Sequence, residues 1–238
     1  MSEAQKAGMR IERRDRAGWI VLDRPERRNA LDRKAIETLI EAISGFGRDA
    51  AVHAVVIAAE GTVFSGGADL KELERKDGSE GIRIYASAIE AIMSSARPVI
   101  ARVQGAAAGG GVGIVAASHL AVAAPSARFL TPETKAGLFP LMVHAILERT
   151  IGRKRAFAMD LTGREIDARE ALDLGLVNAV VEAGDLDATI ESWVGMIAAI
   201  RIPTLERALG ALHATRGLDV VSRVNDLQRV LSEIAESR

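Results

Sequence analysis

Hydrophobic and polar positions in the first half of the chain follow two alternating patterns. Short apolar runs of strand length, such as residues 54–59, are followed by segments whose apolar residues recur at helical spacing. A continuous apolar run of this length is typical of a strand that is covered on both faces. Strands that alternate with helices in this way predict an α/β fold with a parallel sheet and crossover helices.

The pattern also predicts where individual elements begin and end. Asp32 is a candidate N-cap for a helix whose apolar stripe runs from Ile36 to Ile43, and Gly45 and Gly47 are expected to end it. A second stripe, 82–93, includes Tyr85 as one of its apolar positions. The strands are predicted at 18–22, at 54–59, from residue 99 onward, at 120–123 and at 128–130.

From residue 141 onward the pattern is helical alone. Apolar stripes run through 142–151, 154–161, 168–174 and 186–200, and from 205 to the end, with Gly163 and Gly175 as stops. A helical tail with this much apolar surface often packs across a subunit boundary, so we expect an oligomer.

Composition narrows the class of protein. The 238 residues are 48% hydrophobic but only 3% aromatic, so a sizeable core must be built from aliphatic side chains. The chain has no Cys, which excludes disulfides, thiolate zinc sites and a Cys nucleophile.

A net charge of −1 with dispersed Lys and Arg argues against nucleic-acid binding. The four His share no metal-like spacing, so no metal site is expected. No apolar run is long enough to span a membrane and the first 16 residues are polar, so we expect a cytoplasmic protein.

Two glycine loops, each after an apolar strand, form the first candidate site. They are Gly66-Gly67-Ala68-Asp69 and Gly109-Gly110-Gly111, and the second opens an apolar helix. The carboxyl ends of neighbouring parallel strands meet at one edge of a sheet. The start of a helix presents N–H groups and the positive end of a dipole. Two backbone N–H groups, one from each loop, are therefore expected to converge on one oxygen, as an oxyanion hole requires. Tight turns and close helix packing are the alternative.

Glu133 is the candidate acid–base group. It follows Thr131-Pro132 at a predicted helix start and has apolar neighbours in the sequence. Apolar surroundings raise the pKa of a carboxyl group, which suits acid–base work near neutral pH. A first-turn glutamate that interacts with the helix dipole is the structural alternative.

The turn that contains Arg24, Arg27 and Arg28 is a third candidate site. Its arginines are suited to binding phosphate groups, and a solvated charged turn is the alternative.

The glycine helix also contains a dinucleotide-like pattern. Residues 111–116 fit G-x-G-x-x-A after a strand and at a helix start. However, the next strand, 120–123, is followed by Ala124-Pro125 and offers no acidic residue for a ribose hydroxyl. Measured binding of NADH would support this alternative.

Taken together, these segments resemble the enoyl-CoA hydratase/isomerase (crotonase) family from about Ile11 to Val181. The residues that carry the resemblance are Arg24-Pro25 with Asn29-Ala30-Leu31, Phe64-Ser65-Gly66-Gly67-Ala68-Asp69-Leu70, Gly105 with Gly109-Gly110-Gly111, Thr131-Pro132-Glu133, and Leu161-Thr162-Gly163 with 168–177. The resemblance implies an α/β spiral of ββα units. Residues 1–181 would form the acyl-CoA-binding core, and residues 182–238 a C-terminal helical region that builds trimers, often paired into hexamers.

The resemblance also implies roles for single residues. The backbone N–H groups of Ala68 and Gly110 would hold the oxygen of an acyl-CoA thioester, with Glu133 as general acid/base. Thioester chemistry at the α-carbon passes through an enolate, which fixed N–H groups stabilise. No separate cofactor is implied, since coenzyme A is part of the substrate. The residues expected along the substrate and its CoA are Arg28 (at a phosphate), Ala30, Gly67, Asp69, Leu70 and Gly109.

Two departures from the family pattern affect the expected reaction. Hydratases of this family usually carry a first glutamate where this chain has Gly113, and many members have Gly where it has Leu141. Adding water across a double bond requires a base that deprotonates the water and an acid that delivers a proton to the α-carbon, and two carboxylates can share these tasks. One carboxylate suffices for a 1,3-proton shift, because it can remove the proton and return it. The expected reaction is therefore hydration of 2-enoyl-CoA or a shift of 3-enoyl-CoA to 2-enoyl-CoA, and the lone glutamate favours the shift. An acyl-CoA-binding scaffold with little or no catalysis is the alternative.

Overall fold

The computed structural model describes residues 3–68 and 78–236, and its body is built on two sheets. In the first sheet β1 and β2 are antiparallel and the other neighbours are parallel. Its strands, in spatial order, are β1 (Met9–Arg14), β2 (Ala17–Leu22), β3 (Ala54–Ala59), β5 (Val99–Val103), β7 (Leu120–Ala123) and β10 (Ala179–Val180). The second sheet has the order β4 (Val63–Ser65), β6 (Ala106–Ala108), β8 (Arg128–Leu130) and β9 (Ile166–Asp167).

The chain repeats one unit: a strand in the first sheet, a strand in the second, and then a helix. The units are β3–β4 with α4 (Gly78–Met93), β5–β6 with α5 (Gly110–Ala117), and β7–β8 with the short 3-10 helix η2 (Pro132–Ala136). This repetition confirms the predicted α/β spiral of ββα units. The end of each second-sheet strand leads directly into a loop or helix start, which is where the candidate residues lie.

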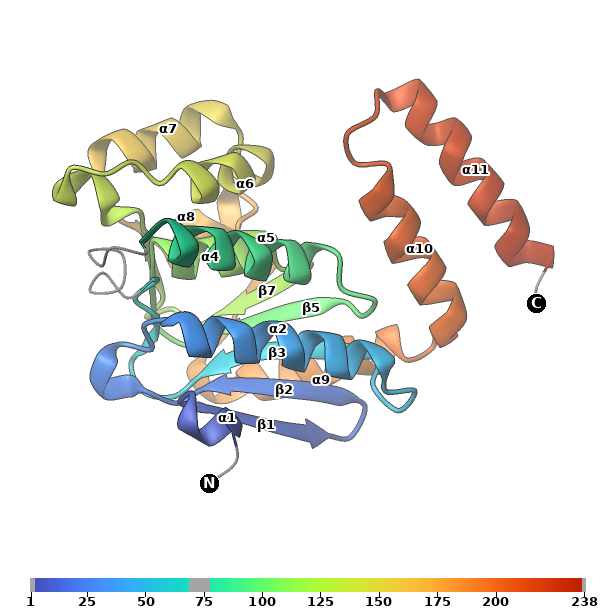
Figure 1. The fold of residues 1–238 in the computed structure, drawn as a ribbon, viewed down its shortest axis with the longest axis horizontal. Helices are drawn as coiled ribbons and strands as arrows, with labels where there is room; N and C mark the ends of the chain where they lie inside the picture. The colour runs from blue at the N-terminus through green and yellow to red at the C-terminus, as the bar shows by residue number, and fades with distance from the viewer. Residues whose placement is uncertain (1–2, 69–77, 237–238) are drawn as a thin grey trace.

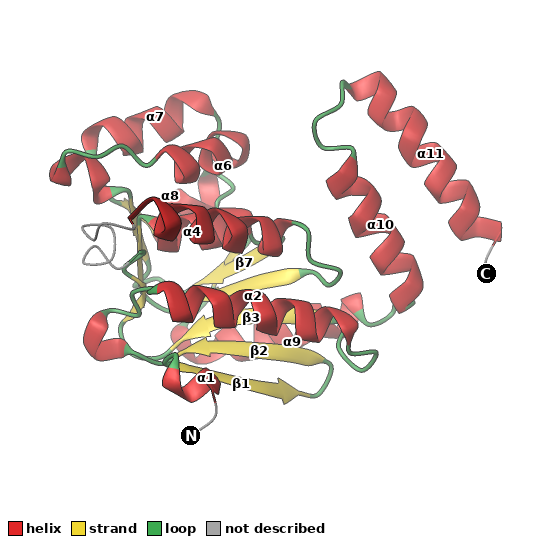
Figure 2. Ribbon diagram, viewed as in Figure 1, coloured by secondary structure: helices red, strands yellow, loops and turns green. Residues whose placement is uncertain are grey.

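Helices cover both faces of the first sheet (Figures 1 and 2). On one face, α2 (Arg33–Arg48), α4 and α5 bury an aliphatic core that includes Ile57 and Ile92. On the other, α9 (Leu186–Ile197) packs against β5 and β7 through Leu186 and Ile190. β3 is covered on both faces, which explains its uninterrupted apolar run. Each fully buried aliphatic side chain stabilises the folded state by about 1.5–3 kcal/mol.

The remaining helices lie beyond these layers. A pair, α6 (Leu141–Ile151) and α7 (Arg153–Thr162), packs next to α5 and η2, and α8 (Ala168–Asp173) follows β9. Two more, α10 (Ile202–Ala214) and α11 (Val220–Glu236), pack on each other to one side of the body (Figure 1). The short elements are α1 (Glu3–Lys6), η1 (Pro25–Arg27) and η3 (Ala183–Asp185).

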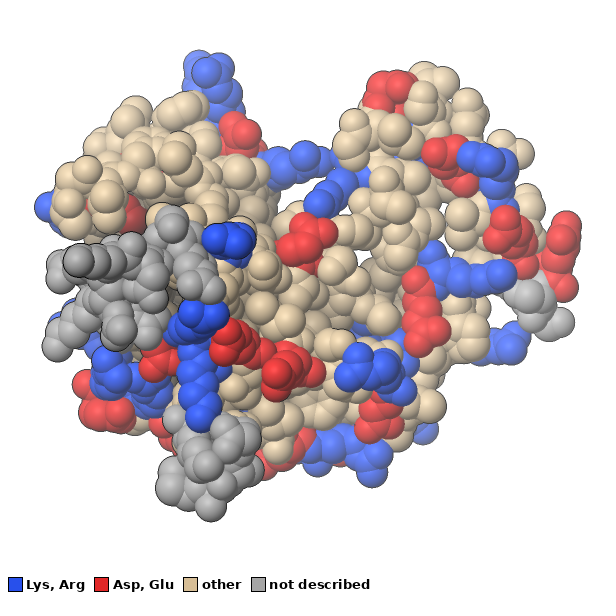
Figure 3. Space-filling view, in the orientation of Figure 1, with Lys and Arg blue, Asp and Glu red and all other residues tan. Residues whose placement is uncertain are grey.

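The surface carries no strong segregation of charge on the face that Figure 3 displays. Acidic and basic residues are interspersed there, and an area over α6 and α7 has few charged residues. Within the described part of the chain, no helix combines the length and apolar character needed to cross a membrane.

Some element boundaries differ from the sequence-based predictions. Gly45 and Gly47 do not end the first long helix; α2 continues to Arg48 because Phe46 packs across Gly18 of β2 and holds the last turn against the sheet. β1 was missed because it is rich in charge, which an edge strand tolerates. The N-cap was predicted correctly: Asp32 accepts a hydrogen bond from the Ala35 N–H at 2.9 Å.

Candidate active site

The two glycine loops lie side by side at the carboxyl ends of β4 and β6, which are paired in parallel. Gly67 of the first loop approaches the second loop closely. A Cβ at this position would lie 2.8 Å from both the Ala108 oxygen and the Gly110 nitrogen, and its φ of +87° also favours glycine. The backbone of the first loop therefore rests directly on the residues that open α5.

The backbones of Ala68 and Gly110 lie close together. A Cβ built on Gly110 would lie 3.3 Å from the Ala68 nitrogen. Gly110 is the first residue of α5, so the i→i−4 ladder of the helix does not use its N–H. The two backbones are therefore close neighbours, as the predicted oxyanion hole requires. Asp69 and Leu70, the next two predicted binding residues, lie outside the described residues.

The arginine turn is joined to the first glycine loop by backbone hydrogen bonds. Gly66 N–H donates to the Arg28 oxygen at 2.7 Å, and Leu31 N–H donates to the Gly67 oxygen at 2.8 Å. Arg28 has a φ of +54° and an exposed side chain, so its guanidinium extends from the turn into solvent. The predicted CoA-binding turn and the predicted oxyanion loop are thus one continuous structure.

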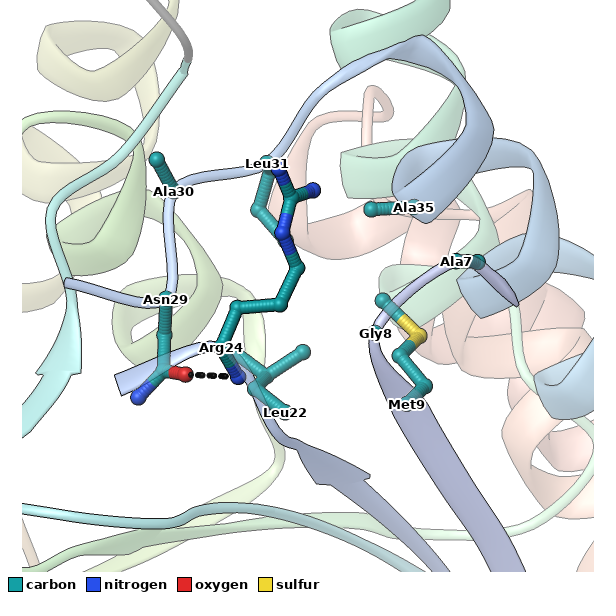
Figure 4. Close-up of a pocket in the computed structure, with 9 residues that line it drawn as sticks. All are labelled: Ala7, Gly8, Met9, Leu22, Arg24, Asn29, Ala30, Leu31 and Ala35. Carbon is teal, nitrogen blue, oxygen red and sulfur yellow. Dashed lines mark hydrogen bonds between the residues drawn. The ribbon is translucent and has the colours of Figure 1, made fainter. Parts of the chain in front are cut away.

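Asn29 holds this turn and was not singled out for this role from sequence. Its side chain is buried, accepts from the Arg24 N–H at 2.8 Å, and donates to the Glu60 and Val63 oxygens at 2.9 and 2.7 Å. Figure 4 displays the bond to Arg24 and a small pocket beside it, which Ala30 helps to line. The only sequence signal was an amide in a turn, where such a side chain commonly bonds to backbone.

Strand pairing places Glu133 next to the second glycine loop. β8 pairs with β6 so that Leu130 lies opposite Ala108, and Gly109 N–H donates to the Leu130 oxygen at 2.9 Å. Glu133, three residues beyond Leu130, then projects back over the loop. A Cβ on Gly109 would be 2.5 Å from its Oε1, and the φ of Gly109 is +50°. Glu133 lies in the first turn of the 3-10 helix η2, at the position where sequence predicted a helix start.

Burial raises the pKa of the Glu133 carboxyl above its ordinary value of 4.5. A backbone hydrogen bond opposes this effect, and the negative charge of Asp160 adds to it. Its Oε2 is buried without a hydrogen-bond partner among the described residues. A half-buried carboxyl with a free acceptor and a raised pKa is suited to exchanging protons with a bound ligand.

Asp160 and His144 form a buried pair behind Glu133. Asp160 is fully buried on α7, its Oδ2 lies 2.6 Å from His144 Nδ1, and its Oδ1 has no partner in the described structure. α7 packs on η2, which carries Glu133. Sequence analysis gave neither residue a role. The available signal was a single acidic residue in the otherwise apolar stretch 156–161.

Tyr85 is a further polar residue to which the sequence assigned no role at the site. It is buried on α4, and its hydroxyl donates to the Gly110 oxygen at 2.7 Å. Its ring is close to both Gly110 and Gly113 of α5. Its position in the apolar stripe of α4 identified it only as a core residue, although it is the only Tyr in the chain.

The sequence pattern that describes the enoyl-CoA hydratase/isomerase family matches residues 13–230. The chain belongs to this family. It is 31% identical to a probable enoyl-CoA hydratase of Rhizobium meliloti over 94% of the chain and 88% of the relative. It is 39% identical to the mitochondrial enoyl-CoA hydratase domain-containing protein 3 of Danio rerio, over 68% of the chain and 57% of the relative. The matched segment therefore spans a little over half of that second protein.

The fold agrees with solved structures of the same family. The crystal structure of an enoyl-CoA hydratase from Mycobacterium smegmatis superposes with a TM-score of 0.90 and is 34% identical, covering 94% of this chain and 90% of that chain. In this member of the enoyl-CoA hydratase/isomerase family, Ala68, Gly109 with Gly110, and Glu133 come together from three separate segments of the spiral. Arg28 and Ala30 lie on the adjoining turn.

Proposed function

We propose that the chain is an acyl-CoA-processing enzyme that shifts the double bond of a 3-enoyl-CoA to position 2. The thioester oxygen accepts hydrogen bonds from the Ala68 and Gly110 N–H groups. Glu133 removes a proton from C2, and the electron pair of that C–H bond moves into the thioester to form a dienolate. Glu133 then returns the proton to C4, the C2–C3 double bond forms, and the carboxylate is regenerated. Fixed N–H groups stabilise the negative oxygen between the two steps.

The observation that carries this proposal is the position of Glu133. Its carboxylate lies over Gly109, one residue before the proposed oxyanion donor Gly110. One carboxylate can take the proton from C2 and return it to C4, so the shift needs no other acid–base group. Hydration of 2-enoyl-CoA is the second candidate, which the similarity to a probable enoyl-CoA hydratase favours.

The remaining substrate contacts follow from the same placement. We expect the CoA moiety to lie along the turn 24–30 and the loop 66–70, with Arg28 at a phosphate and Ala30, Gly67, Asp69, Leu70 and Gly109 along the pantetheine and thioester. An exposed guanidinium beside the site is suited to phosphate recognition. Coenzyme A is part of the substrate, and the proposed shift needs no other cofactor.

Product identification tests the proposed function. Purified protein is offered 2-enoyl-CoA and 3-enoyl-CoA of several acyl lengths, and the products are identified by chromatography and mass. The proposal expects 2-enoyl-CoA from 3-enoyl-CoA, with slower formation of 3-hydroxyacyl-CoA from 2-enoyl-CoA. Faster hydration than double-bond shift at every length would replace the proposed reaction by the second candidate. Binding of CoA esters without turnover of either would instead support a non-catalytic scaffold.

The raised pKa of Glu133 predicts a particular pH dependence. The base must be ionised, so kcat/KM falls as pH drops through the pKa of Glu133, which lies above 4.5 because of burial and, to a smaller extent, Asp160. Asp160→Asn removes a negative charge and is expected to move this acid limb to lower pH. Glu148→Gln is the matched control, because Glu148 also faces His144, at 3.6 Å, but does not contribute to the shift of Glu133. An acid limb that stays in place in Asp160→Asn would contradict this role.

The apolar face of α11 predicts self-association. Val220, Val221 and Val224 are exposed by 78%, 71% and 59%, which is unusual for side chains of this type. We expect a trimer or a dimer of trimers, measured by sedimentation at micromolar concentration. Val221→Asp is expected to shift the protein to smaller species, whereas Arg229→Asp, at an exposed position on the side of the same helix away from these valines, is not. A monomeric wild-type protein would contradict the prediction.

A further inference from the structure

Tyr85 fills the space over the first turn of α5. A Cβ on Gly113 would overlap the Tyr85 hydroxyl oxygen and would lie 3.4 Å from its Cζ and 3.3 Å from Val143 Cγ2. A Cβ on Gly110 would lie 2.9 Å from Tyr85 Cε2. The tyrosine ring is therefore in contact with the inner side of the helix at two glycines, one of which is the proposed oxyanion donor.

A Cβ on Gly110 would lie between the Tyr85 ring and the Ala68 nitrogen, so both border the same space beside Gly110. Tyr85 consequently forms part of the wall next to the site rather than a distant part of the core. Its hydroxyl proton is committed to the Gly110 oxygen at 2.7 Å. Burial, and the nearby charge of Glu133, raise the pKa of Tyr85, so it stays neutral and cannot act as a base near neutral pH.

We infer that Tyr85 is a specificity-determining residue: it occupies the space over Gly113 beside the glycine loops and excludes a second acid–base side chain from it. The inference rests on the proposed function, because it concerns the same site. Hydration needs a water that is held and deprotonated, and a separate proton delivered to the α-carbon. With Tyr85 in place, Glu133 is the acid–base group that remains at the glycine loops among the residues that the structure describes, which favours the proton shift.

A double-mutant cycle on thermal unfolding tests the packing claim without using turnover. Gly113→Ala is expected to lower Tm by several degrees because its Cβ meets the Tyr85 hydroxyl. In a Tyr85→Phe background the hydroxyl is absent, so the same substitution is expected to lower Tm by less than half as much. Alanine is otherwise the better helix former. Gly210→Ala is the control, because its Cβ would meet nothing within 4 Å and its effect should not depend on residue 85. Equal losses from Gly113→Ala in both backgrounds would overturn the inference.

A second variant tests the consequence for the reaction. Tyr85→Ala combined with Gly113→Glu opens the space and places a second carboxylate in it. The ratio of 2-enoyl-CoA hydration to 3-enoyl-CoA shift is expected to rise at least about tenfold over wild type, since one positioned acid–base group is typically worth that or more. Gly210→Ala, whose Cβ would meet nothing within 4 Å, is the control and should leave the ratio unchanged.

The two experiments separate failure of the inference from failure of the proposed function. An unchanged ratio in the double variant, with retained binding of CoA esters and cooperative unfolding, overturns the role of Tyr85 and leaves the wild-type reaction as proposed. Wild-type protein that hydrates 2-enoyl-CoA faster than it shifts 3-enoyl-CoA overturns the proposed function. In that case the Tm cycle still shows whether Tyr85 fills the space over Gly113, but the claim about specificity falls with the function.

Discussion

Replacing Glu133 by Gln is expected to lower kcat for the double-bond shift by about 100-fold or more, because the variant has no carboxylate to carry the proton. KM for the CoA ester should change little. Gln has nearly the same shape, and the proposed contacts to the thioester oxygen come from the backbone of Ala68 and Gly110. The measurement is steady-state turnover of 3-enoyl-CoA by wild type and variant at the pH optimum of the wild type.

Glu191→Gln is the matched control for this change. Glu191 is exposed on α9, on the opposite face of the first sheet from α5, so the same loss of a carboxylate there should leave kcat unaltered. Thermal unfolding of both variants checks that each is folded. Turnover by Glu133→Gln within a fewfold of wild type would mean that Glu133 is not the acid–base group.

Replacing Gly67 by Ala is expected to lower kcat/KM by about 100- to 1,000-fold, the usual cost of losing an oxyanion donor. The added Cβ would lie 2.8 Å from the Ala108 oxygen and the Gly110 nitrogen, both of them backbone atoms that cannot rotate away. The two loops must separate to admit it. Because the Ala68 and Gly110 N–H groups would then no longer point at one oxygen, stabilisation of the enolate is lost even though no catalytic side chain has changed.

Gly175→Ala separates this effect from simple backbone strain. Gly175 has a φ of +80°, close to the +87° of Gly67, but a Cβ there would meet nothing within 4 Å. Both variants therefore carry similar strain, and only Gly67→Ala disturbs the glycine loops. If the two variants lose stability and activity to the same extent, the loops do not form an oxyanion hole of the kind proposed.

Sequence alone was sufficient to predict the layered α/β fold and the loops that meet in it. Apolar runs locate buried strands, and the order of strands and helices fixes which loops share a sheet edge. The detail that sequence did not give is that β4 and β6 belong to a second sheet. That arrangement depends on the sharp change of direction between β3 and β4, for which periodicity carries no signal.

The polar groups around the site were harder to predict because each depends on a contact between distant segments. Tyr85 bonds to Gly110 across 25 residues, and Asp160 meets His144 from a neighbouring helix. In the sequence, Tyr85 occupies an ordinary apolar position of an amphipathic helix. Only the packing of α4 on α5 reveals that its hydroxyl lies over a glycine of the site.

Following a label through the reaction tests the single-carboxylate mechanism most directly. Wild-type protein is given 3-enoyl-CoA that carries deuterium at C2, and the hydrogen gained at C4 of the product is analysed at low conversion. Because one half-buried carboxylate, Glu133, both removes and returns the proton, we predict that a measurable fraction of the deuterium appears at C4. A product whose new C4 hydrogen comes entirely from solvent would contradict the mechanism.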